Sequence, residues 1–196
     1  MKVLFINNRD SFVWNLVDYV SMYESDTVVV PNTISVEEVR DIKPDAIVIS
    51  PGPGNPGNAR DIGNCLDIIR EFGVKVPILG VCLGHQSINT VYGGTIGHSP
   101  DGPVHGKASM ISHDGSELFE GIPGTFAAGR YHSLSIHELA KDVNVIAKND
   151  NGLIMGIKHS SYPVYGVQFH PESILTPEGL KLVGNFLKLA GMRTKD

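Results

Sequence analysis

The sequence is poor in cysteine, with only Cys65 and Cys82 among its 196 residues. So few cysteines argue against the disulfide framework of small secreted domains. Apolar runs are also short, and none approaches the roughly 20 residues that a membrane-spanning helix needs. The opening segment, residues 1–7, is too short for a secretory leader and is typical of a strand. We therefore expect a cytoplasmic protein with no membrane segment.

Basic residues are outnumbered, with 16 Lys plus Arg against 21 Asp plus Glu and a formal net charge of −5. A surface for nucleic acid or an anionic membrane needs a basic patch, so neither partner is expected. The 8 histidines show no metal-ligand spacing with cysteine or carboxylate, and we expect no metal and no cofactor. The 41% of hydrophobic residues suffice for the core of one domain, residues 1–196, with a frayed tail at 193–196.

The first half of the sequence alternates between strand-like and helix-like segments. Strand-like apolar runs lie at residues 2–7, 26–30, 46–49 and 77–81. Apolar residues at helical spacing lie between and after them, at residues 12–23, 36–42, 60–72 and 85–92. Because the strands lack polar alternation, they should be covered on both faces, as in a doubly wound parallel sheet.

The second half is dominated by strand-like segments that turns rich in glycine, proline, asparagine and aspartate connect. They lie at residues 95–98, 108–113, 125–127, 143–148, 153–158 and 164–169. A last amphipathic helix over 180–190 follows Thr176-Pro177-Glu178, a helix-start signal. The expected fold class is α/β, an open, mostly parallel central sheet with helices on both faces and a small antiparallel edge.

A cysteine flanked by glycines follows the strand at 77–81. Gly80 lies two residues before Cys82 and Gly84 two residues after it, a spacing that permits a sharp strand-to-helix turn with strained dihedral angles at Cys82. Such a turn lifts the thiol above the strand end, beside the positive end of a helix dipole, which favours a thiolate. Cys82 is therefore a candidate nucleophile, and the N–H of Leu83 a candidate oxyanion donor. The alternative is a small buried hydrophobic residue, which is the interpretation we favour for Cys65.

A histidine and a glutamate follow the strand at 164–169. His170 and Glu172 lie two residues apart, and Pro171 favours extended backbone at His170, so both side chains should project to one side. Glu172 could then accept a hydrogen bond from one imidazole nitrogen while the other faces the thiol. The pair is a candidate base with its orienting carboxylate. The alternative is an exposed polar turn.

A loop of alternating proline and glycine follows the strand at 46–49. Pro51, Gly52, Pro53 and Gly54 give a stiff backbone with little side-chain bulk, so that backbone amides can lie against a small ligand. The loop falls at the carboxyl end of a strand, as the cysteine turn does, where open α/β sheets bind ligands. An ordinary surface loop is the alternative.

Three motifs together resemble one family. They are the Pro-Gly loop at 51–54, Gly-Val-Cys-Leu-Gly-His-Gln at 80–86 and Gln-Phe-His-Pro-Glu at 168–172. In this order they are similar to the class I (triad) glutamine amidotransferases, and the resemblance covers essentially the whole chain. It implies hydrolysis of the side-chain amide of L-glutamine and delivery of the ammonia to a synthase.

The resemblance also implies roles for single residues. Cys82 would attack the amide carbon and form a thioester, His170 would move the protons, and Glu172 would orient His170. The backbone N–H groups of Leu83 and Gly52 would form the oxyanion hole. Further implied contacts with glutamine come from Pro53, Gly54, Gln86, Ser133 and Leu134.

Two more segments narrow the resemblance. Residues 8–16, Asn-Arg-Asp-Ser-Phe-Val-Trp-Asn-Leu, and residues 130–134, Arg-Tyr-His-Ser-Leu, are similar to the glutamine subunits of anthranilate synthase and aminodeoxychorismate synthase. His105-Gly106-Lys107 matches as well. A chorismate-binding synthase subunit is thus the implied partner. Anthranilate synthesis for tryptophan is the expected pathway, and the folate pathway, or a subunit shared by both, is the alternative.

Two other classes of function fit parts of this pattern. A different hydrolase on a similar turn, such as a cysteine peptidase, would need Cys82 and His170 but neither the Pro-Gly loop nor Gln86. A non-catalytic regulatory or assembly subunit would not need the complete set of Cys82, His170 and Glu172.

Overall fold

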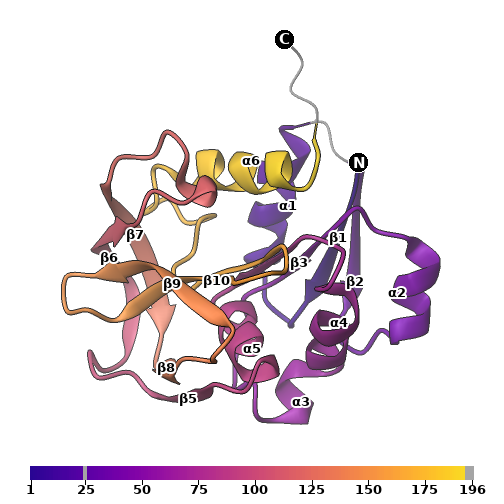
Figure 1. The fold of residues 1–196 in the computed structure, drawn as a ribbon, viewed down its shortest axis with the longest axis horizontal. Coiled ribbons are helices and arrows are strands. Elements are labelled where there is room, and N and C mark those ends of the chain that lie inside the picture. The colour runs from indigo at the N-terminus through magenta and orange to yellow at the C-terminus, as the bar shows by residue number, and fades with distance from the viewer. Residues whose placement is uncertain (24–25, 193–196) are drawn as a thin grey trace.

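The computed structural model describes residues 1–23 and 26–192, and the tail expected at 193–196 lies outside the described residues. A nine-stranded sheet runs through the molecule (Figure 1) in the order β2-β1-β3-β4-β11-β10-β9-β6-β7. The parallel half consists of β1 (Lys2–Asn7), β2 (Asp26–Pro31), β3 (Ala46–Ile49), β4 (Ile78–Val81) and β11 (Val164–Val167). The antiparallel half consists of β6 (Val104–His113), β7 (Thr125–His132), β9 (Val143–Asn149) and β10 (Ile154–His159). A separate antiparallel pair consists of β5 (Thr95–His98) and β8 (Leu134–Glu138).

Helices cover both faces of the parallel half. One face is covered by α1 (Val13–Ser21) and α6 (Gly179–Leu189), which lie together in Figure 1. The other face is covered by α2 (Val36–Ile42), α3 (Ala59–Ile62), α4 (Cys65–Phe72) and α5 (Leu83–Val91). A short 3-10 turn, η1 (Glu117–Phe119), precedes β7. The expected fold class is confirmed. Within the two described ranges, no helix has both the length and the hydropathy to span a bilayer.

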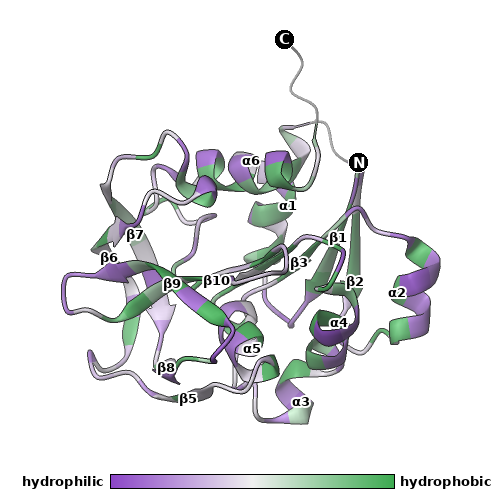
Figure 2. Ribbon diagram, in the orientation of Figure 1, coloured by the Kyte–Doolittle hydropathy of each residue, from purple (hydrophilic) through white to green (hydrophobic). Residues whose placement is uncertain are grey.

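Each central strand contributes to a hydrophobic cluster on both faces of the sheet. In β1, Val3 and Phe5 pack into the cluster under α1 and α6, while Leu4 and Ile6 pack into the cluster under α2 to α5. Figure 2 shows β1, β2 and β3 as mostly hydrophobic, whereas the helices carry both hydrophilic and hydrophobic residues. Burial on both faces explains why the strands lack polar alternation.

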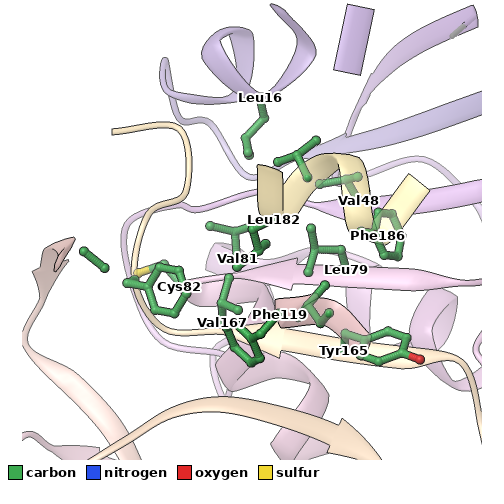
Figure 3. Close-up of a cluster of buried hydrophobic side chains, with 14 of the residues drawn as sticks. Leu16, Val48, Leu79, Val81, Cys82, Phe119, Tyr165, Val167, Leu182 and Phe186 are labelled. Atoms are coloured by element: carbon green, nitrogen blue, oxygen red, sulfur yellow. The ribbon is translucent and has the colours of Figure 1, made fainter. Parts of the chain in front are cut away.

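The cluster under α6 ends at the cysteine turn. Figure 3 shows Leu79 and Val81 of β4 between Leu182 of α6 and Val167 of β11, with Cys82 directly beyond Val81. The candidate nucleophile is thus attached to a fully packed strand, which restricts the movement of its backbone.

The prediction of a single helix over residues 60–72 is wrong, because two helices occupy this region. α3 ends at Ile62 and α4 begins at Cys65, and Gly63 between them has a φ of +54°. A Cβ at position 63 would lie 2.3 Å from the backbone oxygen of Asn32, so the chain bends here to pass the loop after β2. Both helices face the same hydrophobic cluster, which is why apolar spacing alone predicted one continuous helix.

Several boundaries also differ from the expectation. β6 begins at Val104 rather than 108. The sequence does not predict this earlier start, because most of residues 104–110 are exposed and carry no hydrophobic pattern. β7 extends to His132 rather than 127. β8 begins at Leu134, with a single residue between the two strands, and the sequence does not predict it. α5 begins at Leu83 rather than 85, so the helix starts directly after the cysteine.

Candidate active site

Cys82 occupies the sharp turn between β4 and α5, with φ 52° and ψ −99°. The flanking glycines are needed for close approach. A Cβ on Gly80 would lie 2.5 Å from the backbone oxygen of Gly84, and a Cβ on Gly84 would lie 2.4 Å from that of Ile49. Larger residues would push α5 away from β3 and β4. The backbone N–H of Cys82 donates to the carbonyl of Val167 at 2.8 Å, which ties the turn to β11.

His170 and Glu172 form a buried hydrogen-bonded pair after β11. His170 Nδ1 donates to Glu172 Oε1 at 2.6 Å, and the residues are only 2% and 3% exposed. The backbone N–H of His170 donates to the carbonyl of Gly129 in β7 at 2.9 Å. This burial excludes the alternative of an exposed polar turn. The hydrogen bond that the spacing of His170 and Glu172 predicts is therefore present.

The charge state of His170 depends on its neighbours. Burial alone would lower the pKa of His170, but the Cys82 thiol and the Glu172 carboxylate together raise this pKa above its ordinary value. Within the described residues, the buried Nε2 atom has no partner that meets hydrogen-bond geometry. The surroundings thus favour the protonated form of His170, although its Nε2 atom makes no direct hydrogen bond to Cys82.

Two aromatic rings hold the imidazole of His170 edge-on. The ring centroids of Tyr131 and Phe12 lie 4.9 Å and 5.7 Å from that of His170. The Tyr131 hydroxyl lies 3.2 Å from Ser173 Oγ. Neither ring was among the predicted site residues. The sequence signal for both rings is their position inside the segments at 8–16 and 130–134, which carry the family resemblance.

A cavity of about 170 Å³ opens beside Cys82. The residues that line it are Gly52, Pro53, Gly54, Cys82, Gln86, His105, Tyr131, His132, Ser133 and Leu134. The Pro-Gly loop, the cysteine turn and the 130–134 segment, distant in sequence, thus meet at one cavity. Leu83 lies outside the lining but close to the Pro-Gly loop, because a Cβ added to Gly52 would lie 3.0 Å from Leu83 Cδ2. His170 and Glu172 also lie outside the lining.

The carbonyl of Leu134, a residue that lines this cavity, accepts hydrogen bonds from two side chains. His132 Nδ1 approaches it at 2.9 Å and Gln86 Nε2 donates to it at 3.0 Å. Arg130 Nε donates to His132 Nε2 at 3.0 Å, and the Arg130 guanidinium forms an ion pair with Asp101 at 3.0 Å. Burial and the Arg130 charge lower the pKa of His132 to about 4. His132 is therefore a neutral, hydrogen-bonded residue with its proton on Nδ1.

Cys65 lies in a different environment from Cys82, away from the cavity. It is fully buried on α4, and its thiol donates to Asn8 Oδ1 at 3.3 Å. Burial raises the pKa of the Cys65 thiol to about 12. It is a packing residue, as its sequence context indicates.

Comparison with known proteins places this geometry in context. Residues 4–190 match the family described as glutamine amidotransferase class-I. The chain is 48% identical over 193 residues to "Anthranilate synthase component 2" of Thermococcus kodakarensis, covering 96% of this chain and 98% of that protein. It is 49% identical over 196 residues to "Anthranilate synthase component 2" of Methanocaldococcus jannaschii, covering 95% and 96%. A solved glutamine amidotransferase from Thermotoga maritima shares the fold, with a TM-score of 0.76 at 16% identity over 97% of this chain and 96% of that one.

Proposed function

The chain belongs to the class I glutamine amidotransferase family, and from this premise we propose that it is the glutaminase subunit of an anthranilate synthase. It would hydrolyse L-glutamine and deliver ammonia to a chorismate-binding subunit for tryptophan synthesis, acting as one domain over residues 1–196. The observation that carries the proposal is the single cavity where Cys82 meets the Pro-Gly loop and the 130–134 segment, with the buried His170–Glu172 pair nearby. The relatives named anthranilate synthase component 2, which align along nearly the whole chain, support the choice of pathway.

In the proposed acylation step, the Cys82 thiolate attacks the side-chain amide carbon of glutamine. The backbone N–H groups of Leu83 and Gly52 stabilise the oxyanion that forms. His170, protonated by the thiol, gives this proton to the leaving nitrogen, so that the C–N bond breaks and ammonia departs. Glu172 holds the imidazole in the required tautomer through its bond to Nδ1.

In the proposed deacylation step, water attacks the thioester while His170 accepts a proton from it. The C–S bond then breaks, the sulfur leaves with the electron pair, and glutamate is released. Gln86, Pro53, Gly54 and the main chain of Ser133 and Leu134 would hold the amino-acid part of the substrate, since all of them line the cavity.

The ammonia must reach the partner without entering bulk water, where at neutral pH it becomes ammonium and is no longer a nucleophile. The proposed interface with the synthase therefore surrounds the mouth of the cavity. Two exposed apolar side chains support this placement. Ile174 is 93% exposed two residues after Glu172, and Trp14 is 56% exposed two residues after Phe12, whose ring packs against His170.

The test is a Cys82→Ser variant assembled with the natural synthase subunit. We expect glutamine-dependent anthranilate formation to be abolished, while formation from added ammonia stays within about twofold of the wild type. Cys65→Ala is the matched control and should keep both activities. Glutamine use by the Cys82→Ser complex would overturn the assignment, and formation of aminodeoxychorismate in place of anthranilate would move it to the folate pathway.

A second experiment separates this proposal from a different cysteine hydrolase. A glutamine analogue with an electrophile at the amide position should label Cys82, and free glutamine should prevent the labelling. Labelling that is indifferent to glutamine would favour a hydrolase with another substrate.

A further inference from the structure

Gln168 is in direct contact with the candidate nucleophile. Its Nε2 atom lies 3.6 Å from Cys82 Sγ, within the range of a hydrogen bond to sulfur, and the residue is 0% exposed. Among the described residues, this is the side-chain hydrogen bond that the thiol makes, since His170 Nε2 has none. Gln168 directly follows β11, the strand that pairs with the cysteine-bearing β4.

The neighbouring hydrogen bonds fix which end of the Gln168 amide faces the sulfur. The carbonyl of Leu134 can only accept, so the group of Gln86 that faces it must be the amide nitrogen. The same Gln86 nitrogen lies 3.1 Å from Gln168, which must therefore present its Oε1 to Gln86. This leaves the N–H of Gln168 toward Cys82. Reversing either amide would bring two acceptors or two donors together in a buried site, at a cost of about 1–3 kcal/mol per unpaired group.

We propose that Gln168 is a further catalytic residue of the glutaminase reaction, whose buried amide N–H donates to Cys82 Sγ and stabilises the thiolate. Gln86 is the positioning residue that fixes the orientation of this donor. The proposal rests on the function proposed above. The physical reason is that a hydrogen bond to an ionised sulfur in a water-free site is much stronger than one to a neutral thiol.

The N–H of Gln168 acts both before the thioester forms and when the thioester is hydrolysed. Before acylation, it raises the fraction of Cys82 present as thiolate. In the thioester, the sulfur is neutral and a poor acceptor. When water has added and the C–S bond breaks, the sulfur again takes up negative charge and the donor stabilises it. Gln168 therefore assists both the formation of the nucleophile and its release.

The same network limits how Gln86 can meet the substrate. Both hydrogens of its amide nitrogen are spent, one on Leu134 and one on Gln168. Only Oε1 remains, so Gln86 accepts from a donor on the substrate, either an N–H of the side-chain amide or the α-ammonium group. A donor bound there would polarise the chain of amides that ends at Cys82.

The test measures how fast iodoacetamide alkylates Cys82 of the full chain between pH 5 and pH 10. Gln168→Met keeps a similar volume but removes the donor, and Gln86→Met removes the group that orients it. We expect alkylation at neutral pH to fall about tenfold in Gln168→Met and about threefold in Gln86→Met, with the midpoint of the pH profile moved upward in both. At high pH, where the thiol is fully ionised, the rates should converge on the wild-type rate. Cys65 should not react, because it is fully buried.

Asn185→Leu is the control for the loss of a buried amide. Asn185 lies on α6 and donates to the carbonyls of Leu118 and Glu120. Its replacement should lower the melting temperature without moving the alkylation profile. A wild-type profile in a folded Gln168→Met protein would overturn the proposal. If that variant does not fold, an unchanged profile in Gln86→Met would overturn it equally.

These outcomes can be told apart from a failure of the proposed function. Alkylation needs no glutamine and no partner, so a shifted profile in a protein that hydrolyses no glutamine would reject the proposed function alone. An unshifted profile in an active glutaminase would reject only the role of Gln168.

Discussion

One oxygen of the Glu172 carboxylate accepts a 2.6 Å hydrogen bond from His170 Nδ1. The second oxygen is buried and has no hydrogen-bond partner in the described part of the chain. The negative charge of the carboxylate is one of the reasons why the pKa of His170 is raised. A group whose pKa is raised on folding stabilises the protein fully below its unfolded pKa, about 6.5 for histidine, and this contribution is lost as the pH rises through the folded value.

Replacing Glu172 by Gln tests this electrostatic role at nearly constant shape. The amide can still accept from His170 Nδ1, but the charge is gone, so the pKa of His170 should fall. We expect glutamine hydrolysis to drop at least tenfold. The alkaline loss of stability should also be smaller than in the wild type and be complete at lower pH, which thermal melts from pH 7 to pH 10 would show.

Glu117→Gln is the control for the loss of a carboxylate. Glu117 bonds to Lys158 and to the Tyr165 hydroxyl, apart from the cavity lining. Its replacement should leave glutamine hydrolysis unchanged. Wild-type activity in Glu172→Gln would show that His170 needs no charged partner.

Single residues differ in how far the sequence predicts them. Cys82, His170 and Glu172 stand in local patterns, a glycine frame and a two-residue spacing, and short-range geometry decides where their side chains point. Gln168 lies in the same motif as His170, and Tyr131 lies in the 130–134 segment. The contacts of these two residues depend on Gln86 and Phe12, which are distant in the chain. Only the folded structure brings these pairs together.

At the scale of elements, Thr176 joins the segment of His170 to β7. Its hydroxyl donates to the carbonyl of His170 at 2.7 Å and accepts from the N–H of Gly129 at 2.9 Å. The sequence placed Thr176 in a helix-start signal, but α6 begins three residues later, after Glu178, which makes no side-chain cap. The Thr176 hydroxyl instead connects β7 to the segment that carries His170. The local sequence around Thr176 does not reveal this long-range connection.

Thr176→Val keeps the shape of the side chain and removes both hydrogen bonds. We expect the free energy of unfolding to fall by about 1–3 kcal/mol, because buried groups lose their partners. We also expect glutamine hydrolysis to fall by about tenfold, because the carbonyl of His170 is no longer fixed. Steady-state kinetics and urea titration measure the two effects.

The conservative replacement Thr176→Ser keeps the hydroxyl and should retain most of the activity. Equal activity in the valine and serine variants would show that the connection to β7 does not position His170.

The elements of the two halves of the sheet also differ in predictability. In the parallel half, β1, β3, β4 and β11 are buried on both faces, so a continuous apolar run identifies each of them. β8 and the first part of β6 have mixed burial and no such pattern. Their positions depend on pairing with β5 and β7, contacts that no local periodicity encodes.

At the scale of the whole molecule, two buried histidines make stability depend on pH. Burial lowers the pKa of His85 to about 3, and burial with the Arg130 charge lowers that of His132 to about 4. Unfolded histidines titrate near 6.5, so below this pH the unfolded chain binds protons that the folded chain does not. The stability that the neutral histidines provide is complete above about pH 6.5 and is lost as the pH falls toward 4.

Each histidine should therefore weaken the fold by up to about 1.4 kcal/mol per pH unit within this window. Urea titrations between pH 7 and pH 4.5 should show a loss of a few kcal/mol. His85→Leu removes one of these groups and should reduce the slope by up to about 1.4 kcal/mol per pH unit. A slope unchanged by His85→Leu would mean that other groups control the acid sensitivity.

The last strand in chain order, β11, lies in the middle of the sheet between β4 and β10. During synthesis on the ribosome, β4 therefore remains an open edge until residues 164–167 have emerged, by which time more than four-fifths of the chain has been made. Throughout this period, Cys82 lies beside that edge without its histidine, because His170 comes after β11. If His170 serves Cys82 as proposed, we expect a chain that ends before residue 170 to hydrolyse no glutamine.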